Sequence, residues 1–210
     1  MNLKNIKAVI FDCDGVMFDT AEANKRFYNE LLEYFGKPPL TDEQFTKVHM
    51  FTVSQALEYL FPEMESLDIL YKRIKTIGYK KFIKYMNMEE GFLELLSQLK
   101  ENNYIRGVAT NRTNTMEKVL IDYDLENEFD IVVSAADVEL PKPAPDQLIK
   151  IMDYFKLKKD EILFIGDSEY DQLAASNAGT LFAAFKNPLL KADFHFDTMN
   201  EIGELLGINK

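Results

Sequence analysis

The stretch IKAVIF at residues 6–11, followed at once by DCDG at residues 12–15, decides how this chain folds. The first six residues are short, apolar and rich in β-branched side chains, which predicts a buried strand. The acidic tetrapeptide ending in glycine predicts a loop that begins where the strand ends. Comparable strand-like runs return at residues 105–110, 129–135, 161–167 and 180–185.

Helical patterns separate most of these runs. Apolar side chains recur at helical spacing within residues 92–99, before the second run, and within residues 116–120, after it. A further helical pattern covers residues 148–155. Strands that alternate with helices of this length predict an α/β fold, a Rossmann-like core in which helices cover both faces of a parallel sheet.

One region breaks the alternation. No convincing strand pattern occurs from Ala21 to Met88, whereas apolar residues recur at helical spacing within 27–35. The sequences Thr-Asp-Glu-Gln at 41–44 and Thr-Val-Ser-Gln at 52–55 each have the form of a capping box, which predicts two further helix starts. Nearly seventy residues are too many for a loop inside a compact domain.

We therefore expect an inserted domain. The predicted Rossmann-like catalytic core comprises residues 1–17 and 89–210, and an all-α cap domain comprises residues 18–88. In an open parallel sheet, ligands bind beyond the carboxyl ends of the strands. The residues that follow each predicted strand are therefore the candidates for function.

Composition excludes several classes of protein. The chain has 210 residues with 24 basic and 35 acidic side chains, a net charge of −11, which argues against nucleic-acid binding. A single cysteine excludes an intrachain disulfide and a cysteine-cluster zinc site, and two histidines exclude a multi-histidine metal centre. No apolar run approaches the roughly 18 residues of a membrane span, and no signal-peptide layout is present. We expect a cytoplasmic protein, a monomer without membrane or nucleic-acid partners.

Polar side chains stand at the end of each of the first four predicted strands. Because parallel strands end at the same edge of a sheet, these side chains are expected to converge. In chain order they are Asp12 and Asp14, Thr110 and Asn111, Lys142 between two prolines, and Asp167 with Asp171.

These four groups, taken in order, resemble the signature motifs of the haloacid dehalogenase superfamily, specifically its phosphatase branch with a helical cap inserted after the first strand. The motifs are Asp-x-Asp-Gly-Val at 12–16, Thr-Asn at 110–111, Lys142 within Pro-Lys-Pro, and Gly-Asp-x-x-x-Asp at 166–171. The match covers nearly the whole chain. It implies a magnesium-dependent phosphomonoester hydrolase that acts on a small phosphorylated metabolite through an aspartyl-phosphate intermediate.

The resemblance also implies a role for each acid. Asp12 would attack phosphorus, and Asp14 would protonate the leaving oxygen and then deprotonate the hydrolytic water. The Mg²⁺ ligands would be the Asp12 carboxylate, the Asp14 backbone carbonyl and Asp167, with Asp171 bound directly or through water.

Three further groups would complete the site. Lys142 would hold both Asp12 and the transferring phosphoryl group, because its positive charge offsets their repulsion. The Thr110 hydroxyl and the Asn111 backbone N–H would donate hydrogen bonds to phosphoryl oxygens. Charge neutralisation and in-line placement are most of what phosphoryl transfer requires of a protein.

Dehalogenation, sugar-phosphate mutase activity and non-enzymatic binding are the alternatives to phosphomonoester hydrolysis. Dehalogenases of the superfamily lack an acid at the position of Asp14, which favours ester hydrolysis. A β-phosphoglucomutase-like activity is an alternative, although Asn24 stands where the mutase has a cap histidine. A receiver-type signalling module or a catalytically silent phospho-ligand binder is the non-enzymatic alternative, but receivers place their aspartate after the third strand and have no large cap.

The hypothesis requires a particular arrangement of these residues in space. Asp12 must lie within reach of Asp167 and Lys142, and the first and fourth predicted strands must be parallel neighbours.

Overall fold

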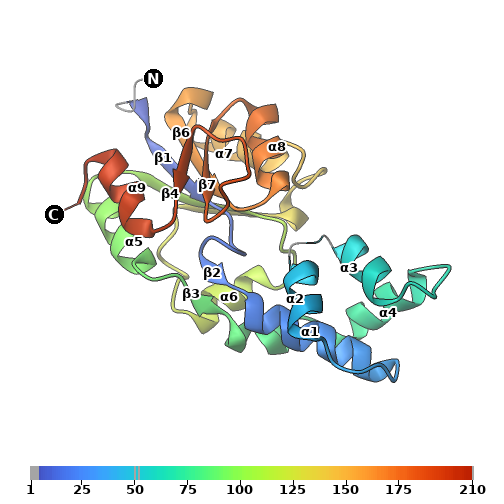
Figure 1. Cartoon of the computed structure of the whole chain (residues 1–210). Coiled ribbons are helices and arrows are strands. Elements are labelled where there is room, and N and C mark those ends of the chain that lie inside the picture. The colour runs from blue at the N-terminus through green and yellow to red at the C-terminus, as the bar shows by residue number, and fades with distance from the viewer. Residues whose placement is uncertain (1–4, 50, 52, 210) are drawn as a thin grey trace. The chain divides into compact units, whose positions relative to one another are not determined.

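Six parallel strands form the main sheet of the computed structural model, which describes residues 5–49, 51 and 53–209 (Figure 1). Their order across the sheet is β5-β4-β1-β6-β7-β8, and every neighbouring pair is parallel. The strands are β1 (Ala8–Phe11), β4 (Ile105–Thr110), β5 (Ile131–Ser134), β6 (Ile162–Gly166), β7 (Leu181–Phe185) and β8 (Phe194–Phe196).

The chain reverses its direction of travel across the sheet between β1 and β6. It runs from β1 outward through β4 to β5, and then returns to place β6 on the other side of β1. Ala8 pairs with Ile162 and Phe11 with Ile165, so the two central strands end together. Such a reversal opens a crevice at the carboxyl ends of the two strands, which is where ligands bind in doubly wound sheets.

Successive side chains of a strand point to opposite faces, so the central strands are buried on both sides. Ile10 belongs to a core cluster with residues of α7 (Asp146–Phe155) and α8 (Glu169–Ala178). The next residue, Phe11, meets Phe92 of α5 (Phe92–Glu101) edge to face, with ring centroids 5.3 Å apart. Figure 1 shows α7 and α8 on one side of the sheet and α5 on the other. The predicted fold class is therefore confirmed.

The remaining elements of this part of the chain connect or flank the sheet. Helix α9 (Met199–Leu206) contacts α5 and β8. Two-residue strands β2 (Phe18–Asp19) and β3 (Asn87–Met88) form a separate antiparallel pair. The others are α6 (Met116–Asp122) and the short 3-10 helices η3 (Ala135–Asp137) and η4 (Lys159–Glu161).

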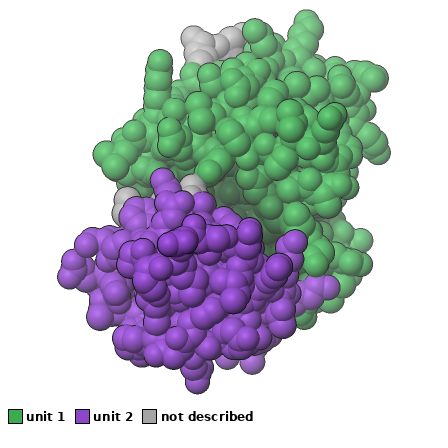
Figure 2. Space-filling view, turned by 90° about the vertical axis from the view of Figure 1, so that its right-hand side faces the viewer, with its two compact units in different colours: residues 1–19, 87–210 green, residues 20–86 purple. Residues whose placement is uncertain are grey.

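The chain divides into two compact units, coloured separately in Figure 2. One comprises residues 1–19 and 87–210 and contains the main sheet, and the other comprises residues 20–86. Buried aromatic and aliphatic side chains, among them Phe27, Leu57 and Phe82, form the interior of the second unit. Its elements are α1 (Ala21–Tyr34), α2 (Asp42–His49), α3 (Val53–Leu60), α4 (Asp68–Ile77) and the 3-10 helix η2 (Lys80–Tyr85).

Two details of the expected secondary structure were wrong. Asn87–Met88 pairs with Phe18–Asp19, although no strand was expected up to Met88, because a two-residue strand is too short to produce an alternating pattern. Strand β8 was missed for the same reason, since it has three residues at the edge of the sheet.

The capping box at Thr41 is present. The backbone N–H of Gln44 donates to Thr41 Oγ1 (3.2 Å), and Gln44 Oε1 accepts from the Thr41 N–H (3.0 Å). Thr52 of the second expected box lies outside the described residues. Among the described residues, no helix has the length and apolarity to cross a bilayer.

The core cluster under α7 offers a direct test of the packing. Leu148 is completely buried there, whereas its neighbour Ile149 on the same helix is 41% exposed. Leu148→Ala is expected to lower the free energy of unfolding by about 2–5 kcal/mol, because the cavity it leaves collapses only in part. Ile149→Ala, the matched control, is expected to cost less than about 1 kcal/mol. Urea denaturation followed by circular dichroism measures both, and equal losses would contradict this packing.

Candidate active site

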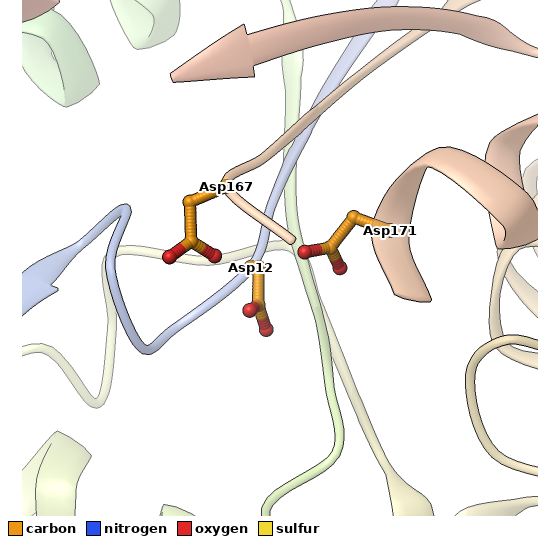
Figure 3. A group of neighbouring side chains, drawn as sticks. All are labelled: Asp12, Asp167 and Asp171. Atoms are coloured by element: carbon orange, nitrogen blue, oxygen red, sulfur yellow. The ribbon is translucent and has the colours of Figure 1, made fainter. Parts of the chain in front are cut away.

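Three aspartates meet beyond the carboxyl ends of β1 and β6. Asp12 directly follows β1, Asp167 follows β6, and Asp171 stands in the first turn of α8. The backbone N–H of Asp12 donates to the Ile165 carbonyl (2.9 Å), which fixes the start of one loop against the end of the neighbouring strand. Each aspartate offers a carboxylate oxygen within 4.8 Å of the other two, and Figure 3 shows the three groups gathered around one space.

Lys142 joins this acidic group from the loop after β5. Its Nζ atom lies 2.8 Å from Asp12 Oδ1 and 2.6 Å from Asp171 Oδ1. It also donates to the Ala109 carbonyl near the end of β4 (2.9 Å), and the residue is only 4% exposed. One buried ammonium therefore connects the ends of β1 and β4 with the start of α8. Asp12 therefore lies within reach of Asp167 and Lys142, and β1 and β6 are parallel neighbours, as the hypothesis required.

Burial and mutual repulsion set the protonation of this group. Burial raises the pKa of Asp12 to about 7, Lys142 opposes the rise, and Asp171 and Asp14 add to it. The pKa of Asp167 is raised well above its usual range by burial and by the Asp171 and Asp12 carboxylates. Burial alone would lower the pKa of Lys142, but Asp12 and Asp171 more than reverse this and raise it. Lys142 therefore stays protonated. The raised pKa values of Asp12 and Asp167 indicate that one ammonium is too little positive charge to hold all the carboxylates in their ionised form.

Two glycines allow the loops to approach this closely. Gly15 has φ +77°, and a Cβ atom placed on it would lie 1.9 Å from Asp167 Oδ2. A Cβ atom on Gly166 would lie 2.3 Å from that of Asp171. The Asp-x-Asp-Gly and Gly-Asp motifs therefore need glycine at these positions for steric reasons, since any larger residue would displace a carboxylate of the group.

Asp171 is held on both oxygens. Its Oδ1 accepts from Lys142, while its Oδ2 accepts from the backbone N–H (3.1 Å) and the hydroxyl (2.5 Å) of Ser168. The Ser168 hydroxyl in turn accepts from the Asp171 N–H (3.3 Å), which completes a capping box at the start of α8. Asp171 is fully buried. Its carboxylate therefore both begins the helix and orients the lysine.

Thr110 and Asn111 are placed by a hydrogen-bond network at the end of β4. The Asn111 side chain donates to the Lys142 carbonyl (2.9 Å), and Thr110 Oγ1 accepts from the Arg112 N–H (3.2 Å). Gln147, which is fully buried, donates to the Thr110 carbonyl (2.6 Å) and accepts from the Lys142 N–H (3.3 Å). The loop that carries Lys142 is therefore tied to the loop that carries Thr110 and Asn111.

The Asp14 side chain belongs to a different pair. Arg112 binds it with both arms of the guanidinium, from Nε to Oδ2 (2.7 Å) and from Nη2 to Oδ1 (2.5 Å). Bidentate pairs of this kind are among the strongest polar contacts between side chains. The structure thus brings Asp12, Lys142, Asp167 and Asp171 together, while Asp14 stands beside them with a cation of its own.

Three contributors were missed from the sequence: Arg112, Gln147 and Ser168. Arg112 directly follows Asn111, so its position next to a strand-end motif was a signal that could have been used. Gln147 precedes the first apolar residue of a helical pattern, and nothing in that pattern distinguishes it from a solvent-exposed residue. The Ser-x-x-Asp spacing from Ser168 to Asp171 has the form of a capping box.

The group fits a divalent cation by charge and by donor type. Ionisation of all three carboxylates beside one ammonium would leave a formal charge of −2, and burial of uncompensated charge is strongly unfavourable unless a cation is added. The free donors are carboxylate oxygens, and Cys13, the only thiol, is buried with its pKa raised by burial and by the Asp14 carboxylate. An all-oxygen site suits magnesium, calcium or manganese rather than zinc or copper.

A doubly wound parallel sheet that gathers three carboxylates and a buried lysine at its switch point is an α/β architecture suited to binding a cation together with an anionic ligand. The haloacid dehalogenase-like hydrolase family matches residues 9–185. The chain belongs to this family. The predicted family is therefore confirmed, as is the prediction of an enzyme.

Similar proteins and solved structures are consistent with membership of this family. The chain is 29% identical over 197 residues to a protein assigned as pyrophosphatase PpaX in Caldanaerobacter subterraneus, covering 86% of this chain and 82% of the relative. A crystal structure of a haloacid dehalogenase-superfamily hydrolase, subfamily IA, from Geobacter sulfurreducens is 41% identical, covers 97% of both chains and superposes with a TM-score of 0.84. A predicted phosphoglycolate phosphatase from Haemophilus somnus shares the fold, with 21% identity, 96% of this chain and 98% of that chain covered, and a TM-score of 0.83.

The contact between Gly15 and Asp167 can be tested. Gly15→Ala is expected to push the Asp167 carboxylate aside and to weaken any binding of a divalent cation there by about tenfold or more, as loss of an orienting contact does at metal sites. Gly36→Ala is the matched control, because Gly36 also has positive φ (+68°) but has no atom within 4 Å of an added Cβ. Both variants should lose about 1 kcal/mol of stability to backbone strain. Isothermal titration with MgCl₂ separates them, and equal affinities would show that the close approach does not matter.

Proposed function

We propose that this chain is a magnesium-dependent phosphomonoester hydrolase that acts on a small phosphorylated metabolite through an aspartyl-phosphate intermediate. The observation that carries the proposal is the contact between the buried Lys142 ammonium and Asp12 (2.8 Å), beside two further carboxylates at the switch point of the sheet. An acid that is buried next to a fixed cation is suited to attack an anionic phosphoryl group. The family match and the names of the relatives support this class of reaction.

In the first step an Asp12 carboxylate oxygen attacks phosphorus. A new bond forms between that oxygen and phosphorus while the bond from phosphorus to the leaving oxygen breaks. Asp14 gives its proton to the leaving oxygen, so the product departs as an alcohol or acid and not as a strongly basic oxyanion. The phosphoryl group remains on Asp12 as a mixed anhydride.

In the second step water hydrolyses this anhydride. Asp14, now ionised, takes a proton from the water, and the resulting hydroxide forms a bond to phosphorus. The bond between phosphorus and the Asp12 oxygen breaks, which frees inorganic phosphate and restores the Asp12 carboxylate. Asp14 holds the transferred proton and is ready for the next turnover.

Three residues would receive the phosphoryl oxygens. Lys142 supplies the fixed positive charge, and the Thr110 hydroxyl and Asn111 backbone N–H supply hydrogen bonds. Groups aimed at charge before the reaction begins stabilise a transition state without reorganisation. The network from Gln147 and from the Asn111 side chain to the Lys142 loop supports such fixed placement.

Magnesium would be held by Asp12, Asp167 and the Asp14 backbone carbonyl. When bound, it would supply positive charge against the transferring phosphoryl group. Asp171 would reach it through a water molecule, because both of its carboxylate oxygens already accept hydrogen bonds from Lys142 or Ser168. Magnesium suits such a site because it commonly retains several waters.

The substrate is proposed as a chemical class, together with the role of the cap, the cellular location and the oligomeric state. Relatives are named as a pyrophosphatase and a phosphoglycolate phosphatase, which favours small, strongly anionic substrates. We propose that residues 18–88, which are mostly helical, act as a cap that sets specificity, and that the protein is a cytoplasmic monomer without nucleic-acid or membrane partners. Mutase activity is not favoured, because Asn24, in the place of the mutase histidine, cannot exchange protons; its side chain bonds Thr20 and Tyr79.

Replacing the nucleophile tests the mechanism. Asp12→Asn keeps the size of the side chain but removes its nucleophilic oxygen, so phosphate release should fall by about 10⁴-fold or more. The control is Asp153→Asn, the same chemical change at an exposed position on α7, which should leave turnover unaltered. Release of phosphate from 4-nitrophenyl phosphate and from phosphoglycolate measures both variants. Substantial residual turnover by a folded Asp12→Asn protein would rule out the aspartyl-phosphate route.

Removal of the metal tests the cofactor. Treatment with a chelator is expected to abolish turnover, and MgCl₂ added in excess is expected to restore it. Calcium should restore little, because it is larger and accepts irregular geometry with more ligands. Unchanged phosphate release from dialysed enzyme in the presence of chelator would contradict the assignment of magnesium.

A further inference from the structure

A groove in the second compact unit carries positive charge that the proposed chemistry does not use. It has a volume of about 980 Å³ and is lined by residues of α1, α4 and η2, of which α1 contacts both of the others. All of its lining residues lie between residues 26 and 85, within the unit that comprises residues 20–86. Its size is at the upper end of the roughly 300–1,000 Å³ of small-molecule sites. The groove therefore has room for a ligand much larger than a single ion.

Much of this positive charge comes from one stretch of sequence. Residues 69–88 contain six lysine or arginine residues and no aspartate or glutamate, although the whole chain has a net charge of −11. Five of the described residues that line the groove are cationic, namely Arg26, Lys37, Arg73, Lys81 and Lys84. Two are acidic, namely Glu30 and Glu33. The groove is thus a basic site on an acidic protein.

Three of the five cations already have a carboxylate partner. The pairs are Arg26 with Glu22 (2.6 Å), Lys37 with Glu63 (2.8 Å) and Lys81 with Glu30 (2.6 Å). Within the part of the chain that the structure describes, Arg73 and Lys84 have no carboxylate at ion-pair distance. Glu33 is the one lining carboxylate of that part outside these pairs, so an excess of positive charge remains.

Aromatic rings of the groove lining hold the two cations that lack an ion pair. The Arg73 guanidinium carbon lies 3.8 Å from the centroid of the Tyr34 ring, and Lys84 Nζ lies 5.0 Å from that of the Tyr85 ring. A ring attracts a cation but does not neutralise its charge, and a guanidinium over a ring keeps donors at its edge. Arg73 Nε is buried and accepts no partner among the described residues. The groove therefore presents two oriented cations to an anion.

A solvated helix face is the simpler explanation of a basic stretch, and two of its lysines fit that explanation. Lys72 and Lys75 are exposed on α4 and lie outside the groove. Arg73, on the same helix, differs from them because it is half-buried, stacked on a ring and part of a hollow. Arg73 and Lys72 are therefore neighbours of equal charge in different surroundings.

We propose that this groove binds a small polyanion with at least two phosphoryl or carboxylate groups, one received by Arg73 and another by Lys84. Both kinds of group accept the paired hydrogen bonds of a guanidinium. A single orthophosphate offers one charged group and occupies a small part of the volume, so it satisfies one of the two cations. The site uses no residue of the candidate active site and does not depend on the proposed hydrolase function.

Isothermal titration of the full chain without magnesium tests the site, with inorganic tripolyphosphate, citrate and orthophosphate as probes at constant ionic strength. Tripolyphosphate or citrate should bind about tenfold or more tightly than orthophosphate, because it engages two cations in place of one. The tighter of the two shows whether the groove takes phosphoryl or carboxylate groups. Equal affinity for all three probes, or no binding of either polyanion, would overturn the proposal.

Variants then place the bound polyanion. Arg73→Gln and Lys84→Gln should each weaken its binding by about tenfold, the usual loss for a hydrogen bond to a charged group. Lys72→Gln is the matched control, since it removes the same charge beside Arg73 but outside the groove, and it should keep the affinity of the wild type. The two groove variants lie on different elements, so either one alone decides the test once circular dichroism shows that it is folded.

Two patterns among the variants would overturn the proposal. Equal losses in Lys72→Gln and the groove variants would mean that the anion is attracted diffusely by the basic stretch. Unchanged affinity in a folded groove variant would mean that the anion binds elsewhere, for example at Lys142. Turnover of 4-nitrophenyl phosphate with magnesium, measured on the wild type, judges the proposed hydrolase function separately from this binding.

Discussion

The ammonium of Lys142, buried between Asp12 and Asp171, is the interaction on which the rest of the site depends. Burial of one charge is costly, and burial of several is tolerable only when they compensate one another. The lysine is shared by two carboxylates, offsets part of their charge, and also donates a hydrogen bond to the Ala109 carbonyl. Because these partners come from the ends of β1 and β4 and from α8, a single ion network fixes how those segments meet.

The sheet makes that network possible. Strands β1 and β6 are neighbours only because the chain reverses between them, and this reversal places Asp12 beside Asp167. The compensation is nonetheless incomplete, since one lysine cannot neutralise three carboxylates. Beside this group, Asp14 and Arg112 form a pair that is neutral by itself. The site therefore combines one cluster whose excess negative charge suits an added cation with one ion pair whose charges balance.

The fold could be predicted because its signals are local. Buried strands of four to six residues, followed by acidic or polar loops, were recognisable for β1 and β4 to β7. The strands missed, β2, β3 and β8, are two or three residues long and depend on tertiary pairing. The residues of the site also divide into those that a local sequence pattern marks and those that it does not. Asp12, Lys142 and Asp167 follow strands and could be found from order alone, whereas Gln147 acts from inside a helix where no pattern marks it.

The roles of the two acids in the first loop illustrate what order alone leaves open. Asp12 and Asp14 are two residues apart and chemically identical, so spacing cannot say which attacks and which moves protons. Their surroundings differ. Asp12 is 8% exposed and contacts the Lys142 ammonium through one carboxylate oxygen, while both carboxylate oxygens of Asp14 accept hydrogen bonds from Arg112. Environment separates paired carboxylates into acid and nucleophile. In the proposed mechanism this difference in surroundings assigns attack to Asp12, whose contact with Lys142 uses Oδ1, and proton transfer to Asp14, which is more exposed.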